Sequence, residues 1–84
     1  MPRTNYRSRL KAEANKWNPL KAIIAGALEV KGMEYTELAD MIRLSRTTMC
    51  SRRKNPQDYR LPELSAIARV LDIPWEDMRN TLPE

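Results

Sequence analysis

The stretch that decides the fold reads YTELADMIRLSRTTMCSRRKNP and spans residues 35–56. Its first part places Leu38, Ala39 and Ile42 on one side of about two helical turns. This narrow apolar stripe is typical of a short helix that packs one face on a core. We therefore predict a helix over about residues 35–42, followed by a break.

A second helix pattern follows the break and runs from residue 46 to about 54. Ser45 suits its N-cap, because the hydroxyl can accept a backbone N–H that has no helical partner. Only Met49 is an obvious inward-facing residue, and Asn55 is expected to end the helix in the left-handed conformation. The outward side chains are Arg46, Thr47, Cys50, Ser51, Arg53 and Lys54. A helix with so little apolar surface gains little from burial, which indicates that it binds a polyanion.

Two amphipathic helices on either side of this stretch are predicted to supply most of the core. The first begins at Asn18-Pro19, with Asn18 as N-cap, and ends at Gly32; the second is opened by Pro62. Their core-facing residues are Leu20, Ile23, Ile24, Ala27 and Leu28 in the first, and Leu64, Ile67, Ala68 and Leu71 in the second.

A last short helix is expected from Pro74 to about residue 80, with a tail at 81–84. Its large apolar residues are Trp75, Met78 and Leu82. In one interpretation these side chains cap the core. In the other they form a self-complementary patch that makes a two-fold dimer. Both interpretations can hold for different faces of the helix.

Composition limits the chemistry that the chain can perform. Eighty-four residues make one small domain, and two glycines without β-branched or aromatic alternation favour an all-α fold. The chain has no histidine, and its single cysteine, Cys50, excludes an internal disulfide and fits a reducing cytoplasm. Gly-rich phosphate loops, CxxC pairs and nucleophile motifs are also absent from the sequence. We therefore predict no enzymatic activity, no catalytic residues, no metal, no cofactor and no small-molecule ligand.

Positive charge is concentrated in two segments. Residues 1–17 carry five Lys or Arg against one Glu, and residues 43–60 carry six against one acidic residue. The segments 18–42 and 61–84 are both net negative. This distribution is the footprint expected of nucleic-acid binding. The longest uncharged apolar run, 22–28, is too short to span a bilayer, so no membrane partner is expected.

The basic segment 1–17 is open to more than one interpretation. It can be a solvated tail, as chain termini usually are. It can instead be an arm that follows the phosphate backbone or enters a minor groove. The arm residues would be Arg3, Arg7, Arg9 and Lys11. Tyr6 and Leu10 at i and i+4 also allow a short extra helix.

The segment 35–56 resembles the helix-turn-helix of the phage repressor/Cro family, also called XRE-type. The matching residues are the pair Leu38-Ala39, then Leu44 and Ser45 at the end of the turn, and Met49 four residues later. The run 61–73 is similar to the fourth helix of that family and its exit. The resemblance covers about residues 18–78. It implies a small five-helix, lambda-repressor-like DNA-binding domain over residues 18–80, with 46–54 as the recognition helix.

Two residues depart from the family pattern. Arg43 occupies a turn position that is commonly Gly, and a non-Gly residue at positive φ costs about 1 kcal/mol. Arg52 occupies a position that is usually apolar. Either the stem of Arg52 lies over the core and its charge reaches a phosphate, or the recognition helix bends away earlier than usual.

The resemblance implies a transcriptional regulator, a repressor of phage or mobile-element type, that acts on the nucleoid in the cytoplasm. It would bind double-stranded DNA as a homodimer, through the major groove of a near-palindromic operator. The base-reading positions of the family fall on Ser45, Arg46, Thr47 and Ser51, with Cys50 at the edge. The expected phosphate contacts are Tyr35, Arg52, Arg53, Lys54 and Arg60, although Tyr35 can equally pack against the N-terminal arm. The alternatives are a DNA-binding antitoxin, and a basic helical module for protein or RNA in which the arm does the work.

Overall fold

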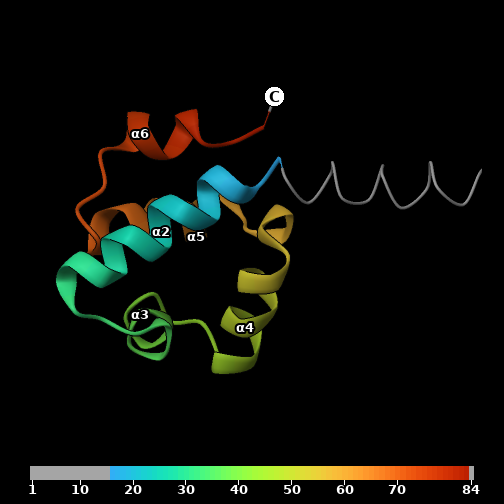
Figure 1. The fold of residues 1–84 in the computed structure, drawn as a ribbon. Coiled ribbons are helices and arrows are strands. Elements are labelled where there is room, and N and C mark those ends of the chain that lie inside the picture. Colours follow the sequence, from blue (N-terminus) through green and yellow to red (C-terminus); the bar gives the residue numbers. More distant parts are fainter. Residues whose placement is uncertain (1–15, 84) are drawn as a thin grey trace, which may run out of the picture.

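The computed structural model of the chain describes residues 16–83. This part folds into five α-helices and one short 3-10 turn, without a strand (Figure 1). The α-helices are α2 (Asn18–Lys31), α3 (Tyr35–Met41), α4 (Arg46–Lys54), α5 (Leu61–Val70) and α6 (Trp75–Asn80), and the 3-10 turn η1 covers Pro56–Asp58. The prediction of a small all-α, five-helix domain is confirmed.

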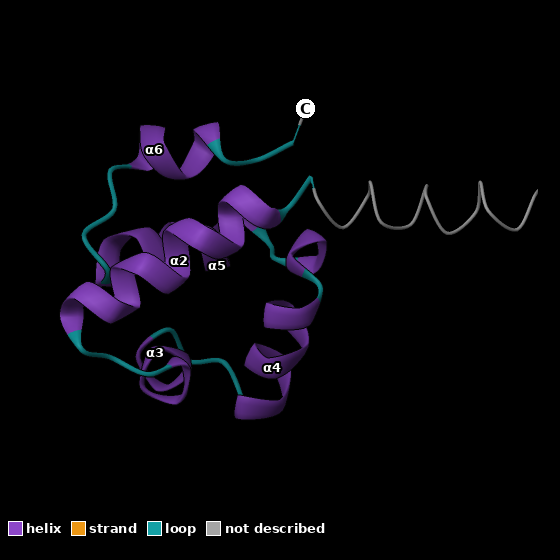
Figure 2. Ribbon diagram, in the orientation of Figure 1, coloured by secondary structure: helices purple, strands orange, loops and turns teal. Residues whose placement is uncertain are grey.

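The helices are arranged around α2 and α5. In Figure 1 these two helices occupy the middle of the molecule, with α3 and α4 on one side and α6 on the other. Figure 2 shows that short loops join the successive helices. Contacts run from α3 to both α4 and α5, and from α5 to α6. The predicted recognition helix and the last helix therefore lie on opposite sides of the α2–α5 layer.

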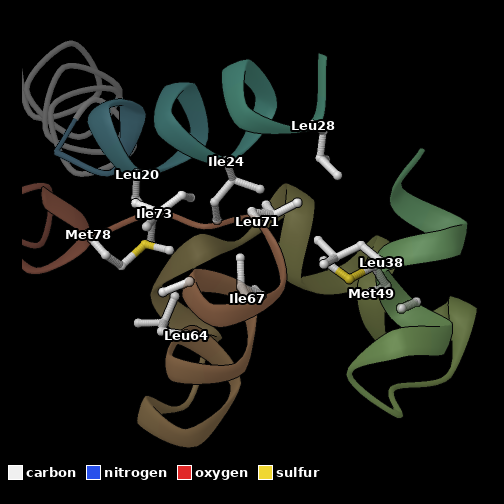
Figure 3. Close-up of a cluster of buried hydrophobic side chains, with 12 residues drawn as sticks. Leu20, Ile24, Leu28, Leu38, Met49, Leu64, Ile67, Leu71, Ile73 and Met78 are labelled. Atoms are coloured by element: carbon white, nitrogen blue, oxygen red, sulfur yellow. The ribbon is translucent and has the colours of Figure 1, made fainter. Parts of the chain in front are cut away.

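The core is a cluster of apolar side chains to which every α-helix contributes. Figure 3 shows Leu20 of α2 beside Ile73 and Met78, Ile24 above Leu71, and Leu28 on the side where Leu38 and Met49 lie. The buried residues are Leu20, Ile24, Leu28, Leu38, Ala39, Met49, Leu64, Ile67, Ala68, Leu71, Ile73 and Met78. The predicted core faces of α2 and α5 are thus confirmed, with Ile23 and Ala27 half-buried against the cluster.

The ends of α2 show one confirmed expectation and one error. Gly32 has φ 64°, and the N–H of Met33 reaches back to the carbonyl of Leu28 over 2.9 Å, as in a Schellman cap. The expected N-cap, Asn18, is wrong by one residue. The N–H of Lys21 bonds to the carbonyl of Trp17 (3.1 Å), so the helix already includes Asn18. Pro is tolerated at its second position because the first N–H groups have no helical partner.

The end of α4 also differs from expectation. Asn55 has φ −128° and ψ 76°, so it is not left-handed. Pro56 follows it, and a proline drives the preceding residue toward extended backbone. The backbone N–H of Asn55 instead bonds to the carbonyl of Ser51 (2.9 Å), and its side-chain amide reaches the same oxygen at 3.4 Å. The helix therefore ends because Pro56 holds Asn55 out of helical backbone, without a left-handed turn.

The turn between α3 and α4 contains the strained position that the sequence predicted. Arg43 has φ 61°. The N–H of Leu44 bonds to the carbonyl of Ala39 (2.9 Å) and that of Arg43 to Asp40 (3.3 Å), which is a Schellman geometry with arginine where glycine is usual. The two hydrogen bonds fix the turn and hold Arg43 in the left-handed region.

Arg43→Gly is expected to stabilise the domain slightly. Relief of the left-handed strain exceeds the extra flexibility of glycine in the unfolded chain by about 0.5 kcal/mol. The midpoint of thermal unfolding should rise by a few degrees in a circular dichroism melt. As a control, Glu29→Gly, at an exposed position inside α2, should lower stability by about 1 kcal/mol. A lower midpoint for Arg43→Gly would mean that the Arg43 side chain stabilises the turn.

No helix within residues 16–83 has the length and apolar content needed to cross a lipid bilayer.

Candidate nucleic-acid interface

α4 begins at a side-chain cap and buries one apolar side chain in the core. The Ser45 hydroxyl accepts the N–H of Thr48 (3.0 Å) and donates to the Thr48 hydroxyl (2.8 Å), which confirms the predicted N-cap. Met49 is 2% exposed and is the one buried side chain of α4. In Figure 3 it packs against Leu38 of α3. The exposed residues of the helix are Arg46, Thr47, Cys50, Ser51, Arg53 and Lys54, and their face is available to a partner.

The outer face of α4 carries a shallow, open hollow of polar side chains. Its lining residues are Arg46, Thr47, Cys50, Ser51, Lys54 and Asn55. Four of the five expected base-reading residues thus share one continuous surface, and the thiol of Cys50 is exposed within it. Ser45, the fifth residue, does not line this hollow. Its hydroxyl already makes two hydrogen bonds in the N-cap of α4.

Arg46 projects from the first turn of α4 with a side chain that is 71% exposed. Its nearest acidic neighbour is Asp40 of α3, with 3.9 Å between Nη2 and Oδ2. An ion pair this long and exposed holds the guanidinium only weakly. Arg46 can therefore exchange this contact for one with a ligand.

Two of the expected phosphate contacts come together across α3 and α4. The guanidinium carbon of Arg53 lies 3.9 Å from the centroid of the Tyr35 ring, a cation–π contact. Stacking on a ring leaves the edges of the guanidinium open for hydrogen bonds to an anion. This pairing could not be predicted from the sequence, because the two residues belong to different helices. The contact holds the Arg53 guanidinium beside the first residue of α3.

Arg52, a third expected phosphate contact, is engaged inside the molecule. Its Nε donates to Oε1 of Glu63 (3.0 Å), and its Nη2 donates to Oε2 at 3.5 Å. The two side chains are only 17% and 14% exposed. Glu63 Oε1 also accepts the backbone N–H of Arg60 (3.0 Å) at the start of α5. The helix continues to Lys54 without bending away, and the charge of Arg52 is directed at α5.

The electrostatic surroundings keep this pair charged. The hydrogen bond to Glu63 raises the pKa of Arg52. For Glu63, burial acts to raise the pKa, but the hydrogen bonds from Arg52 and from the Arg60 backbone outweigh it, so the pKa lies below its usual value. Nearby, burial raises the pKa of Tyr59 far above its ordinary value, and Tyr35 and Glu63 add to this effect. Glu63 is therefore an anion and Tyr59 a neutral phenol at neutral pH.

The remaining expected phosphate contacts lie on the surface. Lys54 is exposed at the end of α4 and borders the hollow, and Arg60 is exposed at the N-cap of α5. The expected arm residues Arg3, Arg7, Arg9 and Lys11 lie outside the described residues. Among residues 16–83, no three or more Cys, Asp or Glu side chains are grouped so as to hold a metal ion.

The three apolar residues near the C-terminus have different surroundings. Met78 is fully buried in the core, and Leu82 packs against it in a half-buried position. Trp75 is 39% exposed on α6. The core-capping interpretation therefore describes Met78 and Leu82, and of the three residues Trp75 presents the most exposed side chain.

The comparisons with known proteins agree with this geometry. A family model described as the Cro/C1-type HTH (helix-turn-helix) DNA-binding domain matches residues 24–83. The matched range contains α3, the turn at Arg43 and α4. No match was found among curated proteins or among solved structures.

Proposed function

The chain belongs to the Cro/C1-type HTH DNA-binding domain family, and from this premise we propose that it is a sequence-specific regulator of transcription. In this proposal α4 enters the major groove of double-stranded DNA. The observation that carries it is the surface of α4, which buries Met49 alone and presents a continuous polar hollow. We propose that the protein acts by binding, without catalysis.

Base recognition is assigned to the outer face of α4. Arg46 can present two parallel N–H groups to O6 and N7 of a guanine, and its weak contact with Asp40 is easily exchanged. Thr47 offers a methyl group to a thymine or a hydroxyl to a base, and Ser51 lies one turn further along. Cys50 lies between them on the same surface. For Ser45 we propose an indirect part, since its hydroxyl fixes the start of the helix.

Phosphate binding is assigned to the basic side chains around this face. Arg53, stacked on Tyr35, and Lys54 lie in the last turn of α4, and Arg60 is exposed at the N-cap of α5. Contacts of this kind supply affinity and salt dependence without reading sequence. Arg52 is left out of this set because its guanidinium is bonded to Glu63.

We also propose that the protein is a repressor of phage or mobile-element type that binds a near-palindromic operator as a homodimer. Trp75 supports this, because a large aromatic side chain remains partly exposed on α6. α6 lies across the α2–α5 layer from α4 (Figure 1), so an interface there leaves the polar hollow open. In a dimer that binds such an operator, two copies of α4 would meet half-sites about 34 Å apart. Repression would follow from occlusion of a promoter.

Selection from a random duplex library tests this proposal, followed by titration of the winning duplex and a scrambled one at two salt concentrations. Enrichment of a two-fold symmetric motif supports a dimeric operator-binding regulator. A single asymmetric half-site would support DNA reading by a monomer and contradict the dimer. Equal, strongly salt-dependent affinity for both duplexes would contradict sequence-specific regulation altogether.

A truncation separates this proposal from a basic module that binds through its arm. The truncated chain lacks residues 1–15 and keeps Trp17, which packs against the core. A major-groove reader should lose affinity but keep its preference for the selected duplex. A protein that binds through the arm should lose nearly all binding to both duplexes.

Lys54→Ala is expected to weaken binding to the selected and scrambled duplexes equally, because a lysine at the end of α4 contacts phosphate. The slope of log K against log salt concentration should fall by about 1. Lys21→Ala is the matched control, since it removes the same charge from an exposed position on α2. An equal loss of affinity and an equal change in slope for both variants would show that net charge, rather than the position of Lys54, determines affinity.

A further inference from the structure

The contact between Arg52 and Glu63 joins the recognition helix to the rest of the domain. Arg52 belongs to α4 and Glu63 to the first turn of α5, and two hydrogen bonds of 3.0 and 3.5 Å connect them. The same Glu63 oxygen accepts the backbone N–H of Arg60, the N-cap of α5. One carboxylate thus ties the last turn of α4 to the start of α5.

α4 has few other means of keeping its orientation. Met49 is its one buried side chain, and it sits in the first half of the helix beside α3. Arg53 adds an exposed stacking contact with Tyr35, which also belongs to α3. Arg52 lies three residues beyond Met49 and supplies a directional attachment to α5 through a planar fork that matches a carboxylate.

We propose that Arg52 and Glu63 are positioning residues for DNA recognition. Their ion pair sets the angle between α4 and the rest of the domain. Because Glu63 also accepts the Arg60 N–H, the pair fixes the start of α5 relative to α4. The pair touches no base and no phosphate, and this inference rests on the proposed function of α4. Without the pair, the outer face of α4 would fit its preferred duplex less well, while general attraction to phosphate would persist.

This assignment predicts the opposite of a direct phosphate contact by Arg52. If Arg52 bound phosphate, Glu63→Gln would release its guanidinium and strengthen binding to every duplex. Arg52→Gln would then lower the salt slope by about 0.9. For a positioning pair, Glu63→Gln weakens binding to the selected duplex, and Arg52→Gln leaves the salt slope unchanged.

The test combines amide exchange on the isolated protein with duplex titration. Glu63→Gln keeps an oxygen that can accept the Arg60 N–H, and should speed exchange of the amides in residues 49–54 about tenfold, while α2 stays protected. Affinity for the selected duplex should fall about tenfold, with less than a twofold change for the scrambled one. Glu76→Gln is the control, because it removes one negative charge from an exposed site on α6.

Two further variants keep the test decisive if Glu63→Gln folds poorly. Arg52→Lys keeps the charge but loses the fork, so it should weaken selective binding like Glu63→Gln; unchanged selective binding would overturn the inference. The double variant Arg52→Gln with Glu63→Gln pairs two neutral amides. Its loss of binding free energy for the selected duplex should be smaller than the sum of the losses in the two single variants. Additive losses would overturn the inference as well.

The two readouts separate failure of this inference from failure of the proposed function. Unchanged exchange in residues 49–54 overturns the positioning role, whatever the DNA result. Faster exchange with undiminished selective binding also overturns it. A wild-type protein without any preferred duplex would overturn the proposed function, and with it the role of the pair in recognition.

Discussion

Arg46→Ala is expected to remove most of the preference for the selected duplex. Loss of a bidentate contact to guanine lowers affinity by about 10- to 100-fold. Binding to a scrambled duplex should change only slightly, because that duplex offers no matching guanine at this position. Fluorescence anisotropy with both duplexes at two salt concentrations measures the two effects separately.

Two variants serve as controls for Arg46→Ala. Arg69→Ala removes the same charge from an exposed position on α5 and should leave the preference intact. Asp40→Asn removes the carboxylate that lies 3.9 Å from Arg46, and should leave selective binding unchanged or slightly stronger. If Arg46→Ala weakened both duplexes equally, Arg46 would be a phosphate contact and the base assignment would be wrong.

Met49→Ala is expected to have the largest effect on stability. Truncating a fully buried methionine costs about 2–5 kcal/mol, through lost apolar burial and the cavity that remains. The free energy of unfolding of a domain of this size is small. The midpoint of thermal unfolding should fall by at least about 10 °C. DNA binding should be lost at temperatures where the wild type still binds, because α4 has no other buried side chain.

Met41→Ala is the matched control for Met49→Ala. Met41 ends α3 and is 57% exposed, so the same chemical change should alter stability by less than about 0.5 kcal/mol. Circular dichroism melts of the two variants compare them directly. Similar shifts in both would mean that α4 does not depend on Met49 for its attachment.

The local features of this fold were predictable because each depends on neighbouring residues. The apolar spacing of α2 and α5, the Ser45 cap and the Gly32 end all follow from side chains within one or two turns. The left-handed φ of Arg43 followed from its place in the turn. The error at Asn55 was also local, since the effect of Pro56 on the preceding residue outweighed the tolerance of asparagine for left-handed backbone.

Contacts between helices could not be predicted, because they need the tertiary arrangement. Arg52 and Glu63 are 11 residues apart, and Lys31 bonds to Asp72 at 2.7 Å from 41 residues away. Asp72 itself has φ 56°, a second non-glycine residue in the left-handed region that the sequence did not indicate. The family pattern drew attention to Arg52 as an unusual charge, but only the fold supplies its partner. The sequence therefore proposes the members of the site, and the fold supplies the contacts between them.

Under the proposed function, the attachment of α4 through Met49 and Arg52 means that folding and target choice are encoded at different positions. The four residues Arg46, Thr47, Cys50 and Ser51 are all exposed, so exchanging them leaves the core intact. If these residues read the bases as proposed, mutations there change what the protein binds and hardly change whether it folds. A designer can then randomise the same four codons to seek new DNA targets without rebuilding the domain.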